Sequence, residues 1–282
     1  MTDRSFATPS ELTDYFIEVG HLKATRPASK QVLLGVVAGA FVALASQGAN
    51  VLAYGLIDTV GLARALSGAI FASALIMVVI AGAELFTGNT LMVISVIKKK
   101  VAVSSMLRSW FLVYIGNFLG ALLVVSMIIA SGQFNLTGGT LGGYTIYVAA
   151  NKNSLAMSSA FILGILCNWL VCLGVWMSSS AQDIPGKILS MFFPIWLFVV
   201  SGFEHSIANM YVMPAGIIAK ANPVWYQAAL DFGVSAERLS NLTWGSFLVN
   251  NLLPVTLGNI IGGAVFVGLT YLIAFGKMDI PK

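Results

Sequence analysis

Three ionisable side chains, Glu84, Glu204 and His205, lie well inside long apolar segments of the sequence. A charged group at membrane depth costs at least ~2.5–3.5 kcal/mol on insertion scales, so each of these residues needs a partner or a function. The ordinary pKa of an imidazole lies near neutral, which makes His205 the natural proton donor to a weak-acid anion. The alternative for His205 is a packing role in which the ring is only hydrogen-bonded.

The two glutamates occupy equivalent positions in a short motif that occurs twice. We expect their carboxylates to accept hydrogen bonds from backbone amides that an interrupted helix leaves free. A carboxylate that faced a pore would repel anions. Glu84 and Glu204 are therefore predicted to support interrupted helices rather than to line a pore.

The remaining polar residues offer little for catalysis. Haem ligation within a membrane and ammonium conduction usually need paired histidines, but the second histidine, His21, lies in a polar N-terminal segment. One histidine and two cysteines, Cys167 and Cys172, do not make up a zinc site. The sequence contains no nucleotide-binding motif. We predict that the chain is not an enzyme and uses neither a metal nor another cofactor.

Composition places the chain in a membrane. Of its 282 residues, 58% are hydrophobic and only 9% are charged. A soluble domain carries about 25% charged residues, so this chain cannot cover a water-facing surface. The basic residues do not form a stripe, and nucleic acid is not an expected partner.

The predicted fold is all-α, with six transmembrane helices. A spanning helix needs roughly 20 mostly apolar residues. The candidates are 31–57, 66–97, 109–130, 156–178, 188–212 and 246–275, and the second and fifth are interrupted. They form a channel domain, 31–275, between an amphipathic segment, 1–30, and a tail, 276–282. Two longer stretches, 131–154 and 212–242, are expected not to span.

Lysines and arginines indicate the orientation of the chain. With the N-terminus inside, eleven of them fall on the inner side and four on the outer side or at outer helix ends. Both termini are therefore predicted to be cytoplasmic.

The N-terminal segment reads as a helix that precedes the first span. Residues 8–11, Thr-Pro-Ser-Glu, fit a capping box with proline at the first helical position. Apolar side chains then recur at helical spacing, at Leu12, Tyr15, Phe16 and Val19. This helix is either an interfacial anchor or a movable lid over the cytoplasmic mouth.

Two polar motifs occur twice, in the same order and three spans apart. Residues 82–89 and 202–209 both fit G-x-E-x-x-x-x-N, and residues 116–120 and 258–262 both fit G-N-x-x-G. Three spans in each half give the halves opposite topology, which is the mark of an inverted 3+3 repeat with its site near the midplane. Irregular backbone at that depth survives only where it is buried in protein or lines a wet cavity. We therefore expect the two interruptions to face each other around a pore, and the G-N-x-x-G segments to serve close helix packing.

Two segments, AELFTGN at 83–89 and SGFEHSIANM at 201–210, closely resemble the signatures of the formate–nitrite transporter family. The resemblance extends from the first span to the sixth. It implies an aquaporin-like fold and a homopentamer with one pore in each protomer. It also implies transport of formate, nitrite or hydrosulfide across a bacterial or archaeal inner membrane.

The same resemblance implies a set of pore residues. Phe71 and Phe198, with Leu75, correspond to apolar constrictions, and Leu85 and Thr87 belong to the loop that interrupts span two. The set of predicted pore residues is Phe71, Leu75, Leu85, Thr87, Lys152, Asn168, Phe198, His205 and Asn209.

The predicted function is a channel for small monovalent anions or their weak acids. Formate is the first candidate, and hydrosulfide and nitrite are the alternatives within the family. A bare anion in hydrocarbon faces a penalty on the order of 20 kcal/mol. The anion is therefore expected to take a proton from His205, or through its water network, and to cross as the neutral acid. The expected partners are thus the anion, protons and, because the chain spans a membrane, lipid. A neutral-solute pore of the aquaporin type is the alternative from another class, but the two Asn-Pro-Ala turns that it requires are absent from this sequence.

Overall fold

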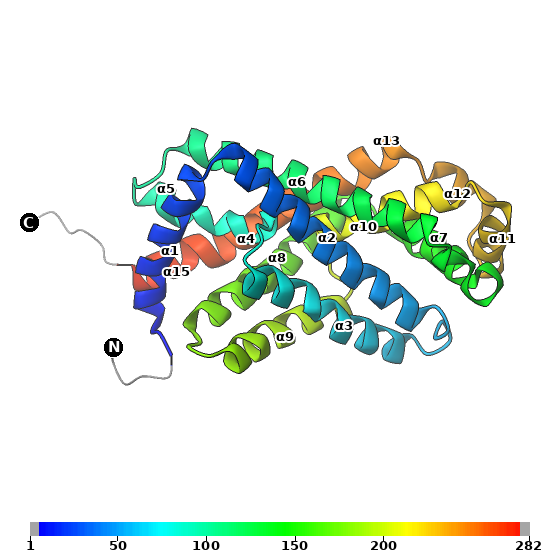
Figure 1. Ribbon diagram of the computed structural model, residues 1–282, viewed down its shortest axis with the longest axis horizontal. Helices are drawn as coiled ribbons and strands as arrows, with labels where there is room; N and C mark the ends of the chain where they lie inside the picture. The colour runs from blue at the N-terminus through cyan, green and yellow to red at the C-terminus, as the bar shows by residue number, and fades with distance from the viewer. Residues whose placement is uncertain (1–5, 277–282) are drawn as a thin grey trace, which may run out of the picture.

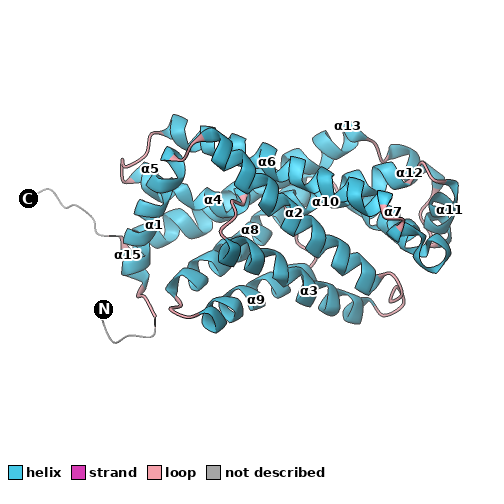
Figure 2. Cartoon of the chain, in the orientation of Figure 1, coloured by secondary structure: helices cyan, strands magenta, loops and turns pink. Residues whose placement is uncertain are grey.

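The computed structural model describes residues 6–276, and within them helices joined by loops and turns are accompanied by one isolated bridge between Phe6 and Ala181. Figure 2 shows this all-helical architecture. The predicted tail, 276–282, lies outside the described residues except for its first residue. The all-α fold class is confirmed.

Five helices are long and apolar enough to cross a membrane. They are α2 (Ala28–Ala53), α3 (Val60–Ala81), α6 (Val103–Ala130), α8 (Met157–Ser180) and a continuous helix, Trp244–Phe275. The last comprises α13 (Trp244–Ser246), η3 (Phe247–Leu252), α14 (Leu253–Gly263), η4 (Ala264–Leu269) and α15 (Thr270–Phe275), of which η3 and η4 are π-helical. These five helices match five of the six predicted spans.

The remaining predicted span consists of two shorter apolar helices. α9 (Ile184–Val200) and α10 (Ser206–Ala219) are separated by non-helical residues 201–205. In the other half of the chain, α3 ends before non-helical residues 82–85, and the chain continues through α4 (Phe86–Asn89), η1 (Thr90–Met92) and α5 (Val93–Ile97). The predicted interruptions of spans two and five are confirmed.

The expected end of the fifth span at residue 212 is wrong, because α10 continues to Ala219. Every residue of α10 except Ile218 is buried. The helix is surrounded by α7 (Thr140–Asn153), α6, α2 and α14. A helix that is apolar on all sides is a core element. The sequence of α10 therefore resembles that of a membrane span, and it does not mark the residue at which this helix ends.

Glycines allow the long helices of each half to touch. α2 packs on α6, and α8 packs on α14. A Cβ atom on Gly39 would lie 2.0 Å from the carbonyl oxygen of Asn117, and one on Gly258 would lie 2.1 Å from that of Phe161. Only glycine permits so close an approach of two backbones, which agrees with the packing expected of the G-N-x-x-G segments.

The N-terminal helix α1 (Pro9–Thr25) begins with the predicted capping box between Thr8 and Glu11. Phe16 stacks on Trp176 of α8 at 4.8 Å, and Ser95 Oγ donates to the carbonyl oxygen of Phe16. α1 therefore lies against α5 and α8 at one end of the molecule, as Figure 1 shows. α7 lies toward the opposite end together with η2 (Gln133–Gly139), α11 (Pro223–Asp231) and α12 (Ala236–Asn241).

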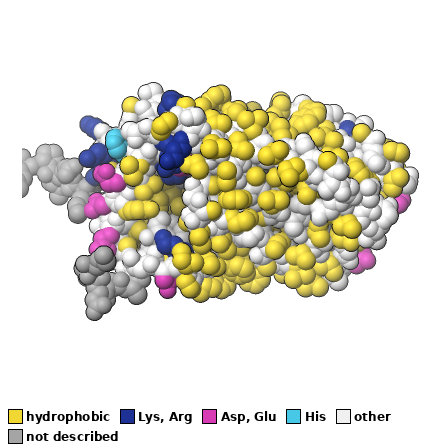
Figure 3. Space-filling model, in the orientation of Figure 1, with side chains coloured by type: hydrophobic (Ala, Val, Ile, Leu, Met, Phe, Trp, Pro, Cys, Tyr) yellow, Lys and Arg dark blue, Asp and Glu magenta, His cyan; other side chains and the backbone are white. Residues whose placement is uncertain are grey.

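Apolar side chains cover the middle of the visible face, and charged side chains gather toward its two ends (Figure 3). Exposed leucine, isoleucine, phenylalanine and valine side chains lie on all the long helices. Lipid, rather than water, is the solvent that suits such a surface. The chain is a multi-pass membrane protein.

Candidate functional site: two cavities and the wall between them

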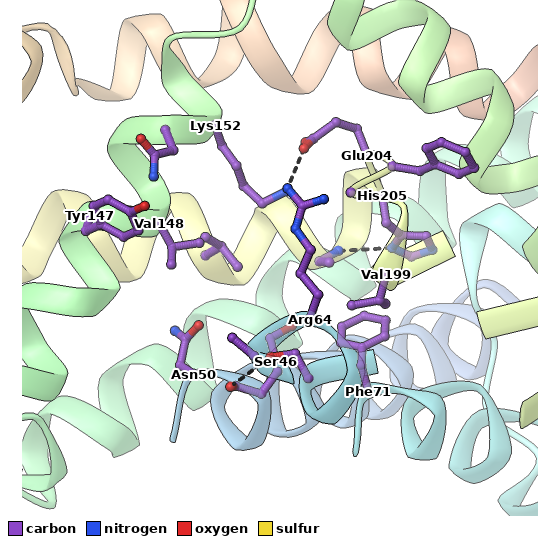
Figure 4. A pocket seen from close by; sticks show the side chains of 18 of the residues that line it. Ser46, Asn50, Arg64, Phe71, Tyr147, Val148, Lys152, Val199, Glu204 and His205 are labelled. Atoms are coloured by element: carbon purple, nitrogen blue, oxygen red, sulfur yellow. Dashed lines mark hydrogen bonds and ion pairs between the residues drawn. The ribbon is translucent and has the colours of Figure 1, made fainter. Parts of the chain in front are cut away.

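Two cavities enter the molecule on either side of the interrupted helices. The larger, of about 430 Å³, is lined among others by Lys152, Arg64 and Glu204, and we call it the Lys152 cavity. The smaller, of about 240 Å³, is lined among others by Lys23 and Glu84, and we call it the Lys23 cavity. Figure 4 shows the Lys152 cavity from close by. α1 supplies part of the wall of the Lys23 cavity, so the two cavities open toward the two ends of the molecule.

An apolar wall separates the cavities. Phe71 and Phe198 line the Lys152 cavity, and their rings meet edge to face at 5.7 Å. Leu75 and Leu85 line the Lys23 cavity. All four side chains are buried, with exposed fractions of 7% or less. The structure thus brings together the residues predicted to form the constrictions.

One polar contact crosses this region. The Nε2 atom of His205 lies 3.1 Å from the hydroxyl oxygen of Thr87, and both residues are buried. The Nδ1 atom of His205 accepts the backbone N–H of Ala208 at 3.1 Å and so caps α10. In a neutral imidazole only one nitrogen carries the proton, so this cap assigns the proton to Nε2. The N–H of His205 then points at Thr87, on the first interrupted helix.

Left-handed glycines end the helices at both interruptions. Gly82 has a φ of 81° and Gly202 a φ of 72°, values that side chains with a Cβ rarely adopt. After each glycine the chain runs extended, and a backbone bond anchors it to a neighbouring helix. The N–H of Glu84 donates to Leu34 at 3.1 Å, and that of Glu204 donates to Leu163 at 3.3 Å.

Asparagines, not glutamates, bind the free backbone at the interruptions, which corrects the expectation for Glu84 and Glu204. Asn117 accepts the N–H of Phe86 at 3.0 Å and donates to the carbonyl oxygens of Gly35 and Glu84. An amide side chain both accepts and donates, so it satisfies an N–H and carbonyl groups together, which a carboxylate cannot do.

Asn259 repeats this arrangement at the second interruption. Asn259 accepts the N–H of Ser206 at 2.9 Å and donates to the carbonyl oxygens of Gly164 and Glu204. The asparagine of each G-N-x-x-G segment therefore holds an interrupted helix, while the glycines provide the packing.

The glutamate side chains form ion pairs instead. Glu84 binds Lys23 at 2.6 Å and also pairs with Arg26. Lys23 donates as well to the side-chain oxygen of Asn89 at 2.6 Å. At the other interruption Glu204 binds Lys152 at 2.8 Å and accepts from Asn209 at 2.7 Å.

These contacts form two Lys–Glu–Asn clusters related by the repeat. Lys152 follows Lys23 by 129 residues (152 − 23), as Leu163 follows Leu34 (163 − 34). Helix α7 is thus the counterpart of α1.

A family model described as formate/nitrite transporter matches residues 10–273. The chain belongs to this family. The formate channel FocA of Haemophilus influenzae is 39% identical, over 93% of this chain and 92% of that protein. FocA of Escherichia coli K12 is 37% identical, over 95% and 94%. These relatives are named as channels, which agrees with the expectation of transport rather than catalysis.

Solved structures of the family share the fold. A structure described as a pentameric formate channel with formate bound has a TM-score of 0.79 and 37% identity, over 89% of this chain and 98% of that one. A second, described as an FNT family ion channel, has a TM-score of 0.75 and 30% identity, over 94% and 98%.

Two residues that the family resemblance assigned to the pore do not line either cavity. Asn168 is fully buried, and its amide donates to the carbonyl oxygens of Thr87 and Asn259 and to the hydroxyl of Thr90. Asn209 is also fully buried and bridges Glu204 and Asn251. Within the described residues, neither asparagine is among those that line the two cavities.

The sequence reasoning missed the roles of Lys23, Asn89, Asn117 and Asn259. The shared spacing of 129 residues would have paired Lys23 with Lys152. The described residues contain no group of three histidines, cysteines or acids that could hold a metal ion.

Proposed function

We propose that this protein is a channel that passes small monovalent anions or their weak acids, and that formate is its physiological substrate. One observation carries the proposal: two cation-bearing cavities approach each other from opposite ends, and a buried apolar wall with one histidine separates them. The names of the relatives and of the structural neighbours favour formate over nitrite and hydrosulfide.

Both cavities have a surplus of one positive charge. Among the described residues, Lys23, Arg26 and Glu84 are the charged residues that line one cavity, and Lys152, Arg64 and Glu204 are those that line the other. Two cations against one carboxylate leave +1 on each side (2 − 1). A cation surplus within low-dielectric walls draws anions inward, and its small size lets the anion leave again.

The wall between the cavities blocks a bare ion. Removing an anion from water costs on the order of 20 kcal/mol in the idealised limit, and Phe71, Phe198 and Leu75 offer no compensating donor. We infer that a proton from the cavity water reaches the anion here through His205, whose ring gives up its Nε2 proton as it takes one from water and so stays neutral, and that the anion crosses as the neutral acid. His205 lines the Lys152 cavity, so its Nε2–H is the group placed to donate to the anion, whereas Thr87 is fully buried, lines neither cavity and serves as the partner of His205.

The proposed setting is a homopentamer in a bacterial or archaeal cell membrane, with both termini cytoplasmic. The structural neighbour described as pentameric supports the assembly. The bias of eleven basic residues to four supports the orientation. In this orientation α1 forms part of the wall of the cytoplasmic vestibule, through Lys23 and Arg26.

Solute flux into proteoliposomes tests the proposal. Formate, nitrite, hydrosulfide and glycerol are compared at about pH 5.5 and about pH 7.5, with protein-free vesicles as the control for direct diffusion of the acids. Selective formate flux that excludes glycerol is the expected result. Faster nitrite or hydrosulfide flux would replace formate as the substrate, and glycerol flux without anion flux would overturn the channel class.

A further inference from the structure

A buried polar cluster stands behind Thr87, the residue that bonds His205. The carbonyl oxygen of Thr87 accepts from the hydroxyl of Thr90 at 2.7 Å, from the amide of Asn168 at 3.1 Å and from the thiol of Cys172 at 3.3 Å. Thr87 and Thr90 belong to α4 and η1, whereas Asn168 and Cys172 lie one turn apart on α8. We call Thr90, Asn168 and Cys172 the anchor cluster.

The members of the anchor cluster bind one another and are shielded from both cavities. The hydroxyl oxygen of Thr90 also accepts from Asn168 at 3.2 Å and lies 3.4 Å from the sulfur of Cys172. All three side chains are fully buried, and none is among the described residues that line either cavity. A Cβ atom on Gly263 of α14 would lie 2.0 Å from the Thr90 hydroxyl oxygen, so a glycine lets α14 close over the cluster. The cluster therefore acts on transport only through Thr87.

The anchor cluster has no counterpart in the other half of the chain. The halves repeat at a spacing of 120 residues at the interruptions (204 − 84) and of 129 residues in the helices to which these are anchored (163 − 34). The positions that correspond to Thr87 and its anchor cluster carry no polar side chain: they are Ile207, Met210, Gly39 and Ala43. An interrupted helix is thus held without such a cluster. What the cluster accompanies is the side chain of the first interruption that bonds His205.

Fixing the Thr87 carbonyl group also fixes its hydroxyl. The β-branched side chain of threonine has few rotamers, so the backbone largely decides where the hydroxyl lies. Here it lies 3.1 Å from Nε2 of His205. A hydroxyl both accepts and donates, so it can accept the Nε2–H and can donate to Nε2 once that proton has left. Thr87 is therefore a partner of the ring in both states, provided that it stays in place.

Asn168 connects the cluster to the second interruption. The same amide donates to the carbonyl oxygen of Asn259 at 2.7 Å. Asn259 in turn binds the backbone on both sides of His205, at Glu204 and Ser206. The position of Thr87 relative to His205 is thereby fixed from both interruptions through one asparagine.

We propose that Thr90, Asn168 and Cys172 are positioning residues for proton delivery, which hold the Thr87 hydroxyl against Nε2 of His205. They set the rate at which the anion is protonated and not the affinity of the cavities for it. The inference rests on the proposed function, because proton delivery by His205 is part of that function. Its proton balance is the same: the ring regains from cavity water the proton that Nε2 gives to the anion.

The first test measures formate flux into proteoliposomes against formate concentration. Thr90→Val removes the hydroxyl at nearly constant volume, and the maximal flux should fall about tenfold because a small displacement of a reacting group slows its reaction. The half-saturating concentration should stay within about twofold, since the residues that line the cavities are unchanged. Thr90→Ser keeps the hydroxyl and should keep the parent flux. Cys172→Ala removes only a weak donor, so it should lower the maximal flux about two- to threefold.

Thr145→Val is the matched control for Thr90→Val. Thr145 of α7 is also fully buried, its hydroxyl donates to the carbonyl oxygen of Leu141 at 2.9 Å, and it lines neither cavity. This variant should lose about as much stability in thermal unfolding as Thr90→Val does, yet keep the maximal flux of the parent. An equal loss of flux in both variants would show that Thr90 acts only through the stability of the protein, and would overturn the positioning role.

The ring of His205 gives a second readout that does not depend on transport. His21 is the other histidine of the chain, so in a His21→Gln background the nitrogen NMR signals of labelled histidine belong to His205 alone. The parent ring should show one neutral tautomer with its proton on Nε2, because Nδ1 accepts from Ala208. Thr90→Val should shift or broaden the Nε2 signal, and Thr145→Val should not. An unchanged Nε2 signal in Thr90→Val would overturn the positioning role.

Failure of the proposed function and failure of this inference give different results. If the parent carries no formate, the proposed function fails, while the spectrum of the ring still decides whether the anchor cluster positions His205. If the parent carries formate but Thr90→Val changes the half-saturating concentration instead of the maximal flux, the cluster acts on binding and the inference is overturned. In a His205→Phe background Thr90→Val should have no further effect on flux, because both changes act on one step. A further loss in that background would likewise overturn the inference.

Discussion

The two interruptions share a scaffold and differ in chemistry. Each has a left-handed glycine, an asparagine that holds the new helix start, and a Lys–Glu–Asn cluster. The residue just before the new helix, however, is Leu85 in the first half and His205 in the second. The repeat builds two matched half-sites, and His205 in place of leucine supplies the one titratable side chain among the described residues of the wall.

The surroundings of the two clusters differ as well. Glu84 has two cationic partners on α1, whereas Glu204 has Lys152 on α7 as its only cation among the described residues. Helix α7 packs against α10 and α11, while α1 lies at the edge of the molecule. One half-site is therefore fixed by the core, and the other depends on a peripheral helix.

The shared scaffold predicts the largest effects. Asn117→Ala and Asn259→Ala each leave one backbone N–H and the non-helical carbonyl group of a glutamate without partners, and each also removes a bond to a carbonyl group within a helix. Each variant should lose at least about 3 kcal/mol of stability, since a buried group without a partner costs about 1–3 kcal/mol. Thermal unfolding in detergent measures the loss, and a large loss in only one of the two variants would contradict the equivalence of the halves.

The difference in chemistry predicts an effect on transport. His205→Phe should lower formate flux about 100-fold or more, the usual contribution of a positioned proton donor. Formate flux through the parent should rise at acid pH, where more protons are available, and this rise should disappear in the variant, because no group at the wall can pass on the proton. Leu85→Met, at the equivalent position of the first interruption, should keep both the flux and its pH dependence. A His205→Phe protein with unchanged pH-dependent flux would refute the proton transfer.

The difference in cation number predicts unequal effects of two matched variants. Lys152→Met leaves the Glu204 carboxylate, which is 5% exposed, without a cation. The loss should be about 2 kcal/mol, below the usual value for a buried pair because Lys152 itself is partly exposed. Lys23→Met leaves Arg26 on Glu84 and should cost less than about 1 kcal/mol. Thermal unfolding measures the stability lost by each of the two lysine variants. Adding Glu204→Gln to Lys152→Met should restore stability, because it removes the unpaired carboxylate. Equal losses for the two lysine variants would show that the clusters do not differ.

Much of this fold could be predicted from the sequence, because lipid demands long apolar helices and the repeated motifs mark where helices break. Apolar length predicted the five long spans, and the paired motifs predicted interruptions near Glu84 and Glu204. The end of α10 could not be predicted in this way, because a helix buried within protein has no change of solvent at its terminus.

The partners of the polar residues were harder to predict than the spans. Asn117 lies 31 residues from Phe86, and Lys23 lies 61 residues from Glu84. Helical periodicity reports which residues share a face of one helix, but it does not report contacts between helices so far apart. Only the comparison of the two halves carries that information, and it had to include α1 and α7.

The smallest expected effect tests the peripheral position of α1. Thr8→Ala removes the hydroxyl that accepts the N–H of Glu11 at 3.4 Å and donates to the Glu11 carboxylate at 2.8 Å. The loss of such a cap costs about 1 kcal/mol, which should speed amide hydrogen exchange in α1 roughly fivefold while exchange in α10 stays unchanged.

Helix α7 provides the comparison, because its N-cap residue, Gly139, has no side chain to cap it and the helix is held by packing. Thr140→Ala, in its first turn, should therefore leave exchange in α7 within about twofold of the parent, since packing against α10 and α11 outweighs one hydroxyl. If α7 loosened as much as α1, the two helices would be equally dependent on local caps. The Lys152 cavity would then be no more rigid than the Lys23 cavity, despite the buried helix that lines it.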